Sequence, residues 1–503
     1  MFPSPLQAVR LLRVATARQD ADPVLDAECA GALLHLWHVH GAPALLAEAL
    51  GHARRSARRA PTGPGHAATA AVLGAQAGEA VRDADPATAL RLLARADTAY
   101  AAACRAAADT PTLCRLILDR VKALEMRWSL DGDDTALHKG IGMLEAVTDF
   151  AGAPHDVALV HGRLLRRLAA TSDDPVEARD HVARSVHCLT AAVAGLRPGQ
   201  VPELDLELAD ALLDAGPDHH EELHAFLTRR LADASGSRQA HLLVRSAHLS
   251  LALHRETRDR HHLATAEEHL TRSLADLPPD GPQHTAALEL LASVLLRAEP
   301  PAAQDTGRAV SALRACIRAT RHHDPALAER RALLGRALLA RYHLTGDRID
   351  LREAEHCLRL AADTVDEPFT RASRLLECGQ VRITAAAGLD RPARLDDAVA
   401  AFRAAVRAAQ EAIDVPGAAA RRTPRRTAQA VVLTARALHL TGTAHEAAQR
   451  PVAAHAAYHR AVQEWTGLPA GMEVTAAPAP RDSAQRLAAL DGTPGLATTT
   501  GDP

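Results

Sequence analysis

Apolar residues recur at helical spacing along most of this chain, and the pattern is clearest in two neighbouring stretches, residues 326–364 and 369–409. Each stretch contains one apolar-periodic segment, a short loop, and a second periodic segment that opens after an acidic residue. Such spacing forms an apolar stripe on one face of an α-helix, so each stretch is predicted to be a pair of helices, A and B. Gly346 and Gly388 fall in the two loops and are predicted to reverse the chain, because glycine adopts left-handed backbone angles without steric cost.

A fixed separation links the two helices of each pair. A small residue, or a valine in one case, precedes a small residue in helix B by 19 positions in seven places: Ala30 and Ala49, Ala77 and Ala96, Val121 and Gly140, Ala247 and Ala266, Gly335 and Ala354, Gly379 and Ala398, and Ala435 and Ala454. In helix B a larger residue follows four positions later and a small or apolar one seven positions later, as in Ala398, Phe402 and Ala405. These three share one helical face, which one pair cannot bury alone, so the pairs are predicted to stack.

Three less regular units bring the number of helix pairs to ten. The helix-B residues that anchor the register are at positions 49, 96, 140, 182, 223, 266, 309, 354, 398 and 454. Consecutive anchors are 41 to 47 residues apart except for a last step of 56, and the number of pairs within 156–234 and 424–465 stays open. The sequence therefore predicts an N-terminal segment at 1–23, a helical repeat array at 24–467, and a disordered tail at 468–503 with one short helix at RDSAQRLAAL.

The small, bulky, small spacing in helix B and the Leu334-Gly335 step in helix A resemble the tetratricopeptide repeat. That family has a shorter unit of about 34 residues, whereas the unit here is about 44 residues, with the excess in the loop between the helices. The stretch RYHLTGDRIDLREAEHCLRLA is similar to the longer repeats of actinobacterial proteins that carry a C-terminal caspase-like (CHAT) peptidase domain. The resemblance implies an all-α, right-handed superhelical solenoid of about ten antiparallel helix hairpins, and 468–503 is too short for a peptidase domain.

Composition agrees with this fold. The chain is 47% hydrophobic but only 2% aromatic, so its interior has to be built mainly from Ala, Leu and Val, which favours closely packed helices. Lysine occurs only at Lys122 and Lys139, and asparagine is absent, which indicates a high-GC, actinobacterial-type genome. A net charge of −3 gives no overall attraction to nucleic acid or to anionic lipid.

The cysteines and the N-terminus point to a cytoplasmic protein. The seven cysteines are far apart in the sequence, without a C-x-x-C motif, and are predicted to be reduced core residues. Arg10, Arg13 and Arg18 interrupt any apolar segment of the length that a secretory signal needs. No apolar run approaches the roughly 20 residues that span a bilayer. We expect no membrane partner and no cofactor.

One motif suggests a metallopeptidase. His220, Glu221 and His224 lie in HEELH, which matches H-E-x-x-H, where two histidines bind zinc and the glutamate polarises a water. Leu223 and Leu227, however, occupy the packing register of the repeat, and no third ligand is evident. The motif is therefore predicted to be an accidental match, with a zinc metallopeptidase as an alternative function.

Histidine and arginine clusters supply weaker alternatives. His35, His38 and His40 could form a metal patch, but they lack Cys or acidic companions and are predicted to be surface residues. Two arginine runs, Arg54, Arg55, Arg58 and Arg59 and then Arg421, Arg422, Arg425 and Arg426, could contact phosphates. Aromatic residues for base stacking are missing, so a nucleic-acid-associated regulator remains an alternative and nucleic acid is not the expected partner.

The resemblance to tetratricopeptide arrays implies a concave groove lined by helices A. The residue after each helix-A small residue is expected to face this groove, and neighbouring positions such as Arg115 join it. The candidate groove residues are Arg115, Lys122, His248, Arg336, Gln380 and Arg436. Arginine binds carboxylates bidentately, so we expect an acidic segment or a C-terminal carboxylate of a partner protein. The predicted function is a non-enzymatic scaffold or adaptor for protein–protein interaction.

Overall fold

A computed structural model describes residues 5–17, 22–60, 63–148, 155–172, 174–194, 196–197, 199–298, 301–321, 324–388, 393–414, 424–468 and 478–491. These residues contain 22 α-helices, one short 3₁₀ helix and no strand, so the all-α prediction is confirmed. The chain divides into two compact units, unit 1 at Met1–Phe226 and unit 2 at Leu227–Pro503. The boundary falls within α11, and each unit is described by itself.

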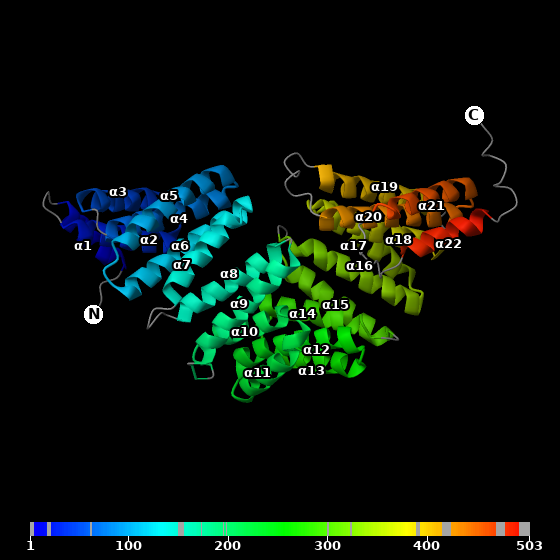
Figure 1. The fold of residues 1–503 in the computed structure, drawn as a ribbon, viewed down its shortest axis with the longest axis horizontal. Coiled ribbons are helices and arrows are strands. Elements are labelled where there is room, and N and C mark those ends of the chain that lie inside the picture. The colour runs from blue at the N-terminus through cyan, green and yellow to red at the C-terminus, as the bar shows by residue number, and fades with distance from the viewer. Residues whose placement is uncertain are drawn as a thin grey trace. The chain divides into compact units, whose positions relative to one another are not determined.

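Unit 1 contains α1 (Pro5–Thr16), α2 (Pro23–His40), α3 (Pro43–Arg59), α4 (Gly63–Arg82), α5 (Pro86–Arg105), α6 (Thr110–Asp131), α7 (Thr135–Thr148), α8 (His155–Thr171), α9 (Pro175–Ala194), α10 (Pro202–Asp214), the 3₁₀ helix η1 (Pro217–His219) and the start of α11 (His220–Ala232) (Figure 1). Unit 2 contains the rest of α11, then α12 (Gly236–Thr257), α13 (Arg260–Asp276), α14 (Pro282–Leu295), α15 (Ala303–Ala319), α16 (Ala326–Thr345), α17 (Arg348–Asp363), α18 (Pro368–Gly388), α19 (Ala393–Asp414), α20 (Pro424–Ala447), α21 (Pro451–Trp465) and α22 (Pro480–Asp491).

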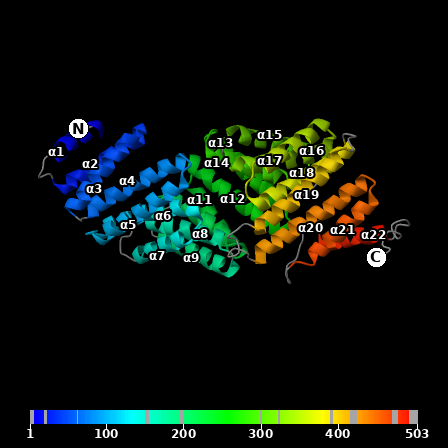
Figure 2. The ribbon, with the colours of Figure 1, turned by 90° about the horizontal axis from the view of Figure 1, so that it is seen from above.

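The helices alternate as A and B in the predicted order. In unit 1 the pairs α2 with α3, α4 with α5, α6 with α7 and α8 with α9 pack together, and in unit 2 so do α12 with α13, α14 with α15, α16 with α17, α18 with α19 and α20 with α21. Helices α10 and α11 occupy the fifth place in this order. Each helix B also contacts the next helix A within its unit, as α17 contacts α18 and α19 contacts α20 (Figures 1 and 2). Contacts between neighbours in sequence are what a helical repeat array requires.

The fixed separation of 19 positions is a packing register. All fourteen residues of the seven pairs are buried. A Cβ atom added to Gly379 would lie 2.3 Å from Cε1 of Phe402, and one added to Gly335 would lie 2.6 Å from Cγ of Leu358. The bulky residue four positions after the helix-B anchor therefore rests directly on the glycine of helix A, which is why that site has no side chain.

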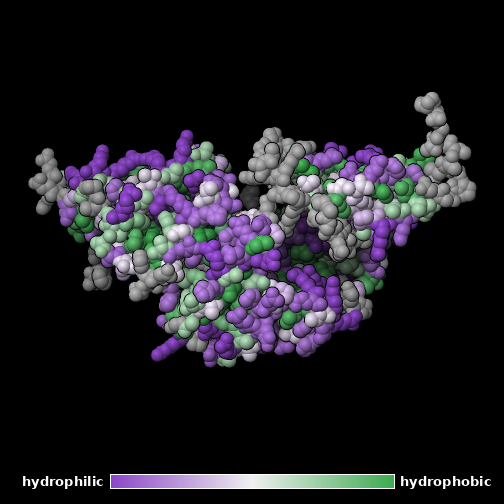
Figure 3. All heavy atoms as spheres, viewed as in Figure 1, coloured by the Kyte–Doolittle hydropathy of each residue, from purple (hydrophilic) through white to green (hydrophobic). Residues whose placement is uncertain are grey.

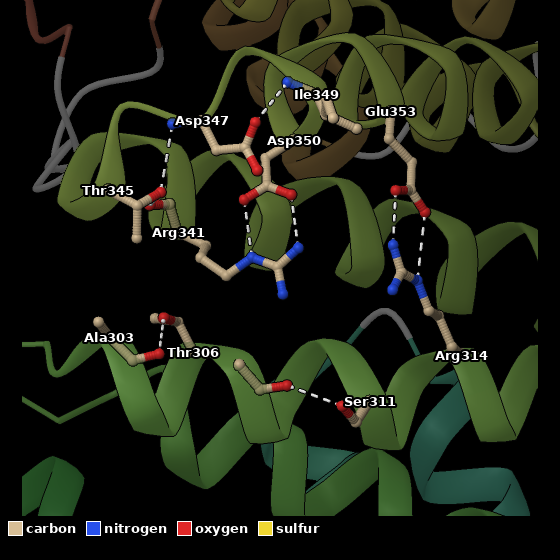
Figure 4. A network of polar contacts seen from close by, with 11 residues as sticks. Ala303, Thr306, Ser311, Arg314, Arg341, Thr345, Asp347, Ile349, Asp350 and Glu353 are labelled. Atoms are coloured by element: carbon tan, nitrogen blue, oxygen red, sulfur yellow. Dashed lines mark hydrogen bonds and ion pairs between the residues drawn. The ribbon is translucent and has the colours of Figure 1, made fainter.

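One loop glycine behaves as predicted and the other does not. Gly346 has a φ of 71° and ends α16, with its N–H donating to the carbonyl of Tyr342. Asp347 follows and caps α17 by accepting from the backbone N–H of Ile349 at 2.9 Å (Figure 4). Gly388 is the last residue of α18 and has no positive φ, so the prediction of a left-handed reversal there is wrong. Its missing side chain serves packing instead, because a Cβ would lie 2.1 Å from the hydroxyl of Tyr342.

Ion pairs join successive hairpins at separations of about one repeat. Between helices B of unit 2, Arg308 pairs with Glu267 at 2.6 Å, and Arg394 pairs with Glu355 at 2.7 Å. Arg314 of α15 reaches Glu353 of α17 at 2.6 Å, as Figure 4 shows. Neighbouring hairpins are thus matched by charge as well as by apolar packing, although exposed pairs contribute only about 0–1 kcal/mol each.

The ends of the array carry one further helix each. At the N-terminal end α1 packs on α2, and Arg13 of α1 binds Glu48 of α3 at 2.6 Å. At the C-terminal end α22 packs on α21 and buries Ser483. The hydroxyl of Ser483 accepts from Nε1 of Trp465 at 3.1 Å and lies 3.0 Å from Nδ1 of His439. The short helix expected at RDSAQRLAAL is therefore present as α22, and it is docked on α21. Residues 469–477 and 492–503 lie outside the described residues.

The cysteines are mostly core residues, as the sequence analysis predicts. All seven cysteines are free, five of them are buried, and burial raises the pKa of each thiol, to about 11 for Cys316. The face shown in Figure 3 is mostly hydrophilic, with hydrophobic residues in small groups. Within the described ranges, we find no helix with both the length and the apolar character needed to span a membrane.

Candidate functional site

A row of surface positions follows the buried register on the helices A. We call helix-A row the residues one position after the buried small residue: Gly31, Gly78 and Lys122 in unit 1, and His248, Arg336, Gln380 and Arg436 in unit 2. Five of them are exposed, and Gly78 and Arg436 are half-buried. A Cβ atom on Gly31 or Gly78 would meet no atom within 4 Å. On each unit the row is thus accessible, as the groove prediction requires.

In unit 1 the predicted basic residues of the row lie on α6. Lys122 is exposed, and its ammonium group is 3.2 Å from Oδ1 of Asp119. Arg115 is also exposed and precedes Lys122 by seven residues, which is about two helical turns and places both on one face. An exposed ion pair between residues three apart is weak, so Lys122 remains available to a second carboxylate.

In unit 2, Arg336 belongs to a small charge network between α16 and α18. Its guanidinium lies 3.0 Å from Glu329 and 3.5 Å from Glu377. Arg374 contacts the same two glutamates, with 2.9 Å to Glu377, and burial raises the pKa of the Glu377 carboxyl. Two arginines and two glutamates balance one another, so the surface around Arg336 is less positive than the sequence suggested.

The remaining candidate residues of unit 2 differ in their surroundings. His248 on α12 and Gln380 on α18 are exposed. Arg436 on α20 is half-buried, and this burial lowers the pKa of its guanidinium. The three residues share the row but not a common cluster, because each belongs to a different helix A. The arrangement suits an extended ligand better than a compact one.

The HEELH segment begins α11. His220 is buried, while Glu221 and His224 are exposed, and Leu223 and Leu227 are buried as the register predicted. Two histidines that bind one zinc ion have to face the same accessible space. Across the described part of the chain, no group of three or more His, Cys, Asp or Glu residues could hold a metal ion, and this includes the exposed His35, His38 and His40.

The first arginine run surrounds a buried aspartate that sequence reasoning missed. Asp26 of α2 is 0% exposed, and its Oδ1 lies 2.7 Å from Nδ1 of His52 on α3. Arg55 and Arg59 approach the same carboxylate at 3.3 and 3.6 Å. Two of the four arginines in this run, Arg55 and Arg59, therefore bind α3 to α2. The sequence did not predict this contact, because a single aspartate in the first turn of a helix is common there. In the second run Arg421 and Arg422 lie outside the described residues, as do the side chains of Arg425 and Arg426.

Taken together, the stacked hairpins and the exposed helix-A row define a helical-repeat protein. No protein-family model matches the chain, and no curated protein matches it either. Among solved structures, a human IFIT1 dimer with PPP-AAAA aligns over 92% of this chain and 95% of its own at 13% identity and a TM-score of 0.39. The apo form of the quorum sensor NprR from B. thuringiensis aligns over 68% of this chain and 88% of its own, at 13% identity and a TM-score of 0.40. Yeast Tom70 aligns over 92% of this chain and 95% of its own, at 10% identity and a TM-score of 0.30.

Proposed function

We propose that this chain is a non-catalytic binding protein, and that each of its two units holds an extended segment of a partner protein along its own part of the helix-A row. The observation that carries this proposal is that five of the seven positions of the row are exposed, each next to a residue of the buried register. Repeat arrays present such rows on neighbouring helices, and an extended ligand can contact several helices in turn. Small residues at Gly31 and Gly78 leave room for a ligand backbone to approach.

The partner segment is acidic in this proposal. In unit 1, Arg115 and Lys122 offer two cationic groups on one face of α6, and in unit 2, Arg336 offers one on α16. The pair of Arg336 with Glu329 is open to water, with side chains that are 42% and 44% exposed. Such a pair contributes little, so a carboxylate of the ligand can replace Glu329 at small cost.

Peptide binding tests the proposal on the full chain. Two fluorescent peptides of equal length are compared by anisotropy, one rich in Asp and Glu and the other with Asn and Gln at the same positions. The Arg115→Ala/Lys122→Ala double variant tests unit 1, and Arg336→Ala tests unit 2. Arg58→Ala on α3 and Arg272→Ala on α13 are matched controls, because both remove an exposed arginine from a helix B.

The acidic peptide is expected to bind more tightly than its amide counterpart. Each lost charge-assisted contact should cost about 1.5–3 kcal/mol of binding free energy, while the controls should cost less than about 1 kcal/mol. Equal losses for row and control variants would refute the row as the site. Preferential binding of a single-stranded RNA, with the same sensitivity to the row variants, would favour the nucleic-acid alternative instead.

A further inference from the structure

The last hairpins of unit 2 border an open hollow of about 430 Å³ between α19, α20 and α21. The three helices lie side by side, with α20 in contact with both of the others (Figures 1 and 2). Its volume is within the range of about 300–1,000 Å³ that small-molecule sites occupy. Its lining combines three arginines, one histidine, one threonine and an apolar floor: Arg403, Arg407, Arg460, His445, Thr441, Val406, Leu438, Ala453, Ala456 and Ala457.

The charged groups of this hollow are all cationic. Arg403 and Arg407 are four residues apart on α19 and share a face, and Arg460 comes from α21. No carboxylate lines the hollow, and none within the described ranges forms an ion pair with these three arginines. The carboxylate of Asp396, near the start of α19, is bound instead by Arg450 at 2.6 Å.

In a preceding hairpin, the arginine at the position of Arg403 pairs with a glutamate. Arg314 is the fifth residue after the anchor Ala309, and it pairs with Glu353, the residue before the anchor of α17 (Figure 4). Arg403 is the fifth residue after the anchor Ala398, and the residue before the anchor of α21 is Ala453. The position before the helix-B anchor is thus Glu353 in α17 but Ala453 in α21. The methyl group of Ala453 lines the hollow.

His445 adds a hydrogen-bonding nitrogen to this hollow but little charge. Burial lowers the pKa of His445, and the cationic Arg450 and Arg403 lower it further. The imidazole is therefore neutral at pH 7. Three exposed guanidinium groups line this partly apolar hollow, and an anion with several acceptor oxygens could pair with more than one of them.

We propose that this hollow binds a small molecule that carries a phosphate group on an apolar body. The phosphate oxygens would receive hydrogen bonds from Arg403, Arg407 and Arg460, a geometry that planar guanidinium groups provide. The apolar body would lie on Val406 and Leu438. This site is separate from the helix-A row, because His445 and Arg436 are nine residues apart, which places them about 180° apart around α20.

Calorimetric titration of the full chain with naphthyl phosphate tests this inference. Naphthol is the uncharged control, and inorganic phosphate is the control without an apolar body. Naphthyl phosphate is expected to bind more tightly than either control, and Arg403→Gln and Arg460→Gln are expected to weaken it by about tenfold or more. Arg272→Ala, on another helix B of the same unit, should leave the affinity unchanged.

The decisive variant is Ala453→Glu, which restores the glutamate that Glu353 supplies to Arg314. It should pair with Arg403, abolish binding of naphthyl phosphate, and leave the thermal melting of the protein unchanged or raised. Should this variant melt early, the Arg403→Gln result decides in its place. Unchanged binding in Ala453→Glu or Arg403→Gln, no binding to the wild type, or equal affinity for inorganic phosphate would each overturn the proposal. None of these outcomes bears on the helix-A row.

Discussion

Adding one methyl group at Gly379 probes the packing register directly. A Cβ atom there would lie 2.3, 2.6 and 2.8 Å from three ring carbons of Phe402. Phe402 is 0% exposed, so its ring has no open side into which it could move. Gly379→Ala therefore has to push α18 and α19 apart or force the ring out of its rotamer.

The expected magnitude follows from two opposing effects. Alanine in place of glycine stabilises a helix interior by about 1 kcal/mol. Overpacking in a filled core costs about 1–3 kcal/mol, and three contacts below 3.0 Å place this site near the upper value. Gly379→Ala should thus destabilise the protein by about 2 kcal/mol, the difference between these two effects.

Urea unfolding, followed by far-UV circular dichroism, measures this effect. Gly307→Ala in α15 is the matched control, because a Cβ there would meet no atom within 4 Å, and it should stabilise unit 2 by about 1 kcal/mol. In the double variant Gly379→Ala/Phe402→Leu, the two changes should be less destabilising together than their sum, by about 1–2 kcal/mol. A Gly379→Ala protein as stable as the Gly307→Ala protein would refute the register.

Three further variants test other parts of the fold. Ala398→Trp should destabilise the array by about 1–3 kcal/mol or more through overpacking at a fully buried anchor, and a melting curve equal to that of the wild type would contradict this. Arg258 ends α12 with a φ of 58°, whereas Gly132 and Gly346 end other helices A in the same left-handed region. Arg258→Gly should therefore raise the free energy of unfolding by about 0.5–1 kcal/mol, measured by urea unfolding. An unchanged or lower unfolding midpoint would argue against strain at this residue. Burial lowers the pKa of His439 below its ordinary value of 6.5, so the unfolded chain takes up a proton at a higher pH than the folded chain does. The stability that the neutral His439 provides is therefore present above pH 6.5 and is lost as the pH falls below 6.5 towards the lowered pKa. His439→Gln should therefore reduce the fall in the unfolding midpoint between neutral and acidic pH, and an identical fall in both proteins would show that His439 has no part in it.

The buried register was predictable because it depends on local rules. Helical periodicity places Gly379 and Phe402 on facing stripes, and the separation of 19 positions is set by two helices and a short loop. The order of A and B helices could be read from the same pattern, as could the free, buried cysteines. These features need only neighbours in sequence, and such neighbours make most of the contacts in a repeat array.

The role of Gly388 and the docking of α22 were decided by tertiary contacts. Gly388 packs under Tyr342, a residue of the preceding hairpin, and its sequence context alone suggested a turn. The α22 segment is 12 residues long, and a helix of that length is marginal in isolation. The contacts of Ser483 with His439 and Trp465 hold α22 in place, and the sequence of α22 alone does not predict them.

The candidate sites divide in the same way. The helix-A row could be predicted from the sequence because each of its positions directly follows a residue of the buried register. The pairing of Lys122 with Asp119 could also be predicted, because the two residues are three positions apart on one helix. The network of Arg336 with Glu377 was not, since α18 supplies the second residue. The hollow lined by Arg403 and Arg460 exists only because α19 and α21 both pack against α20. Sequence periodicity determined which faces of the helices are buried. The stacking of the hairpins decided which charged residues meet, because such contacts depend on the distances between helices and not on the spacing of residues along one helix.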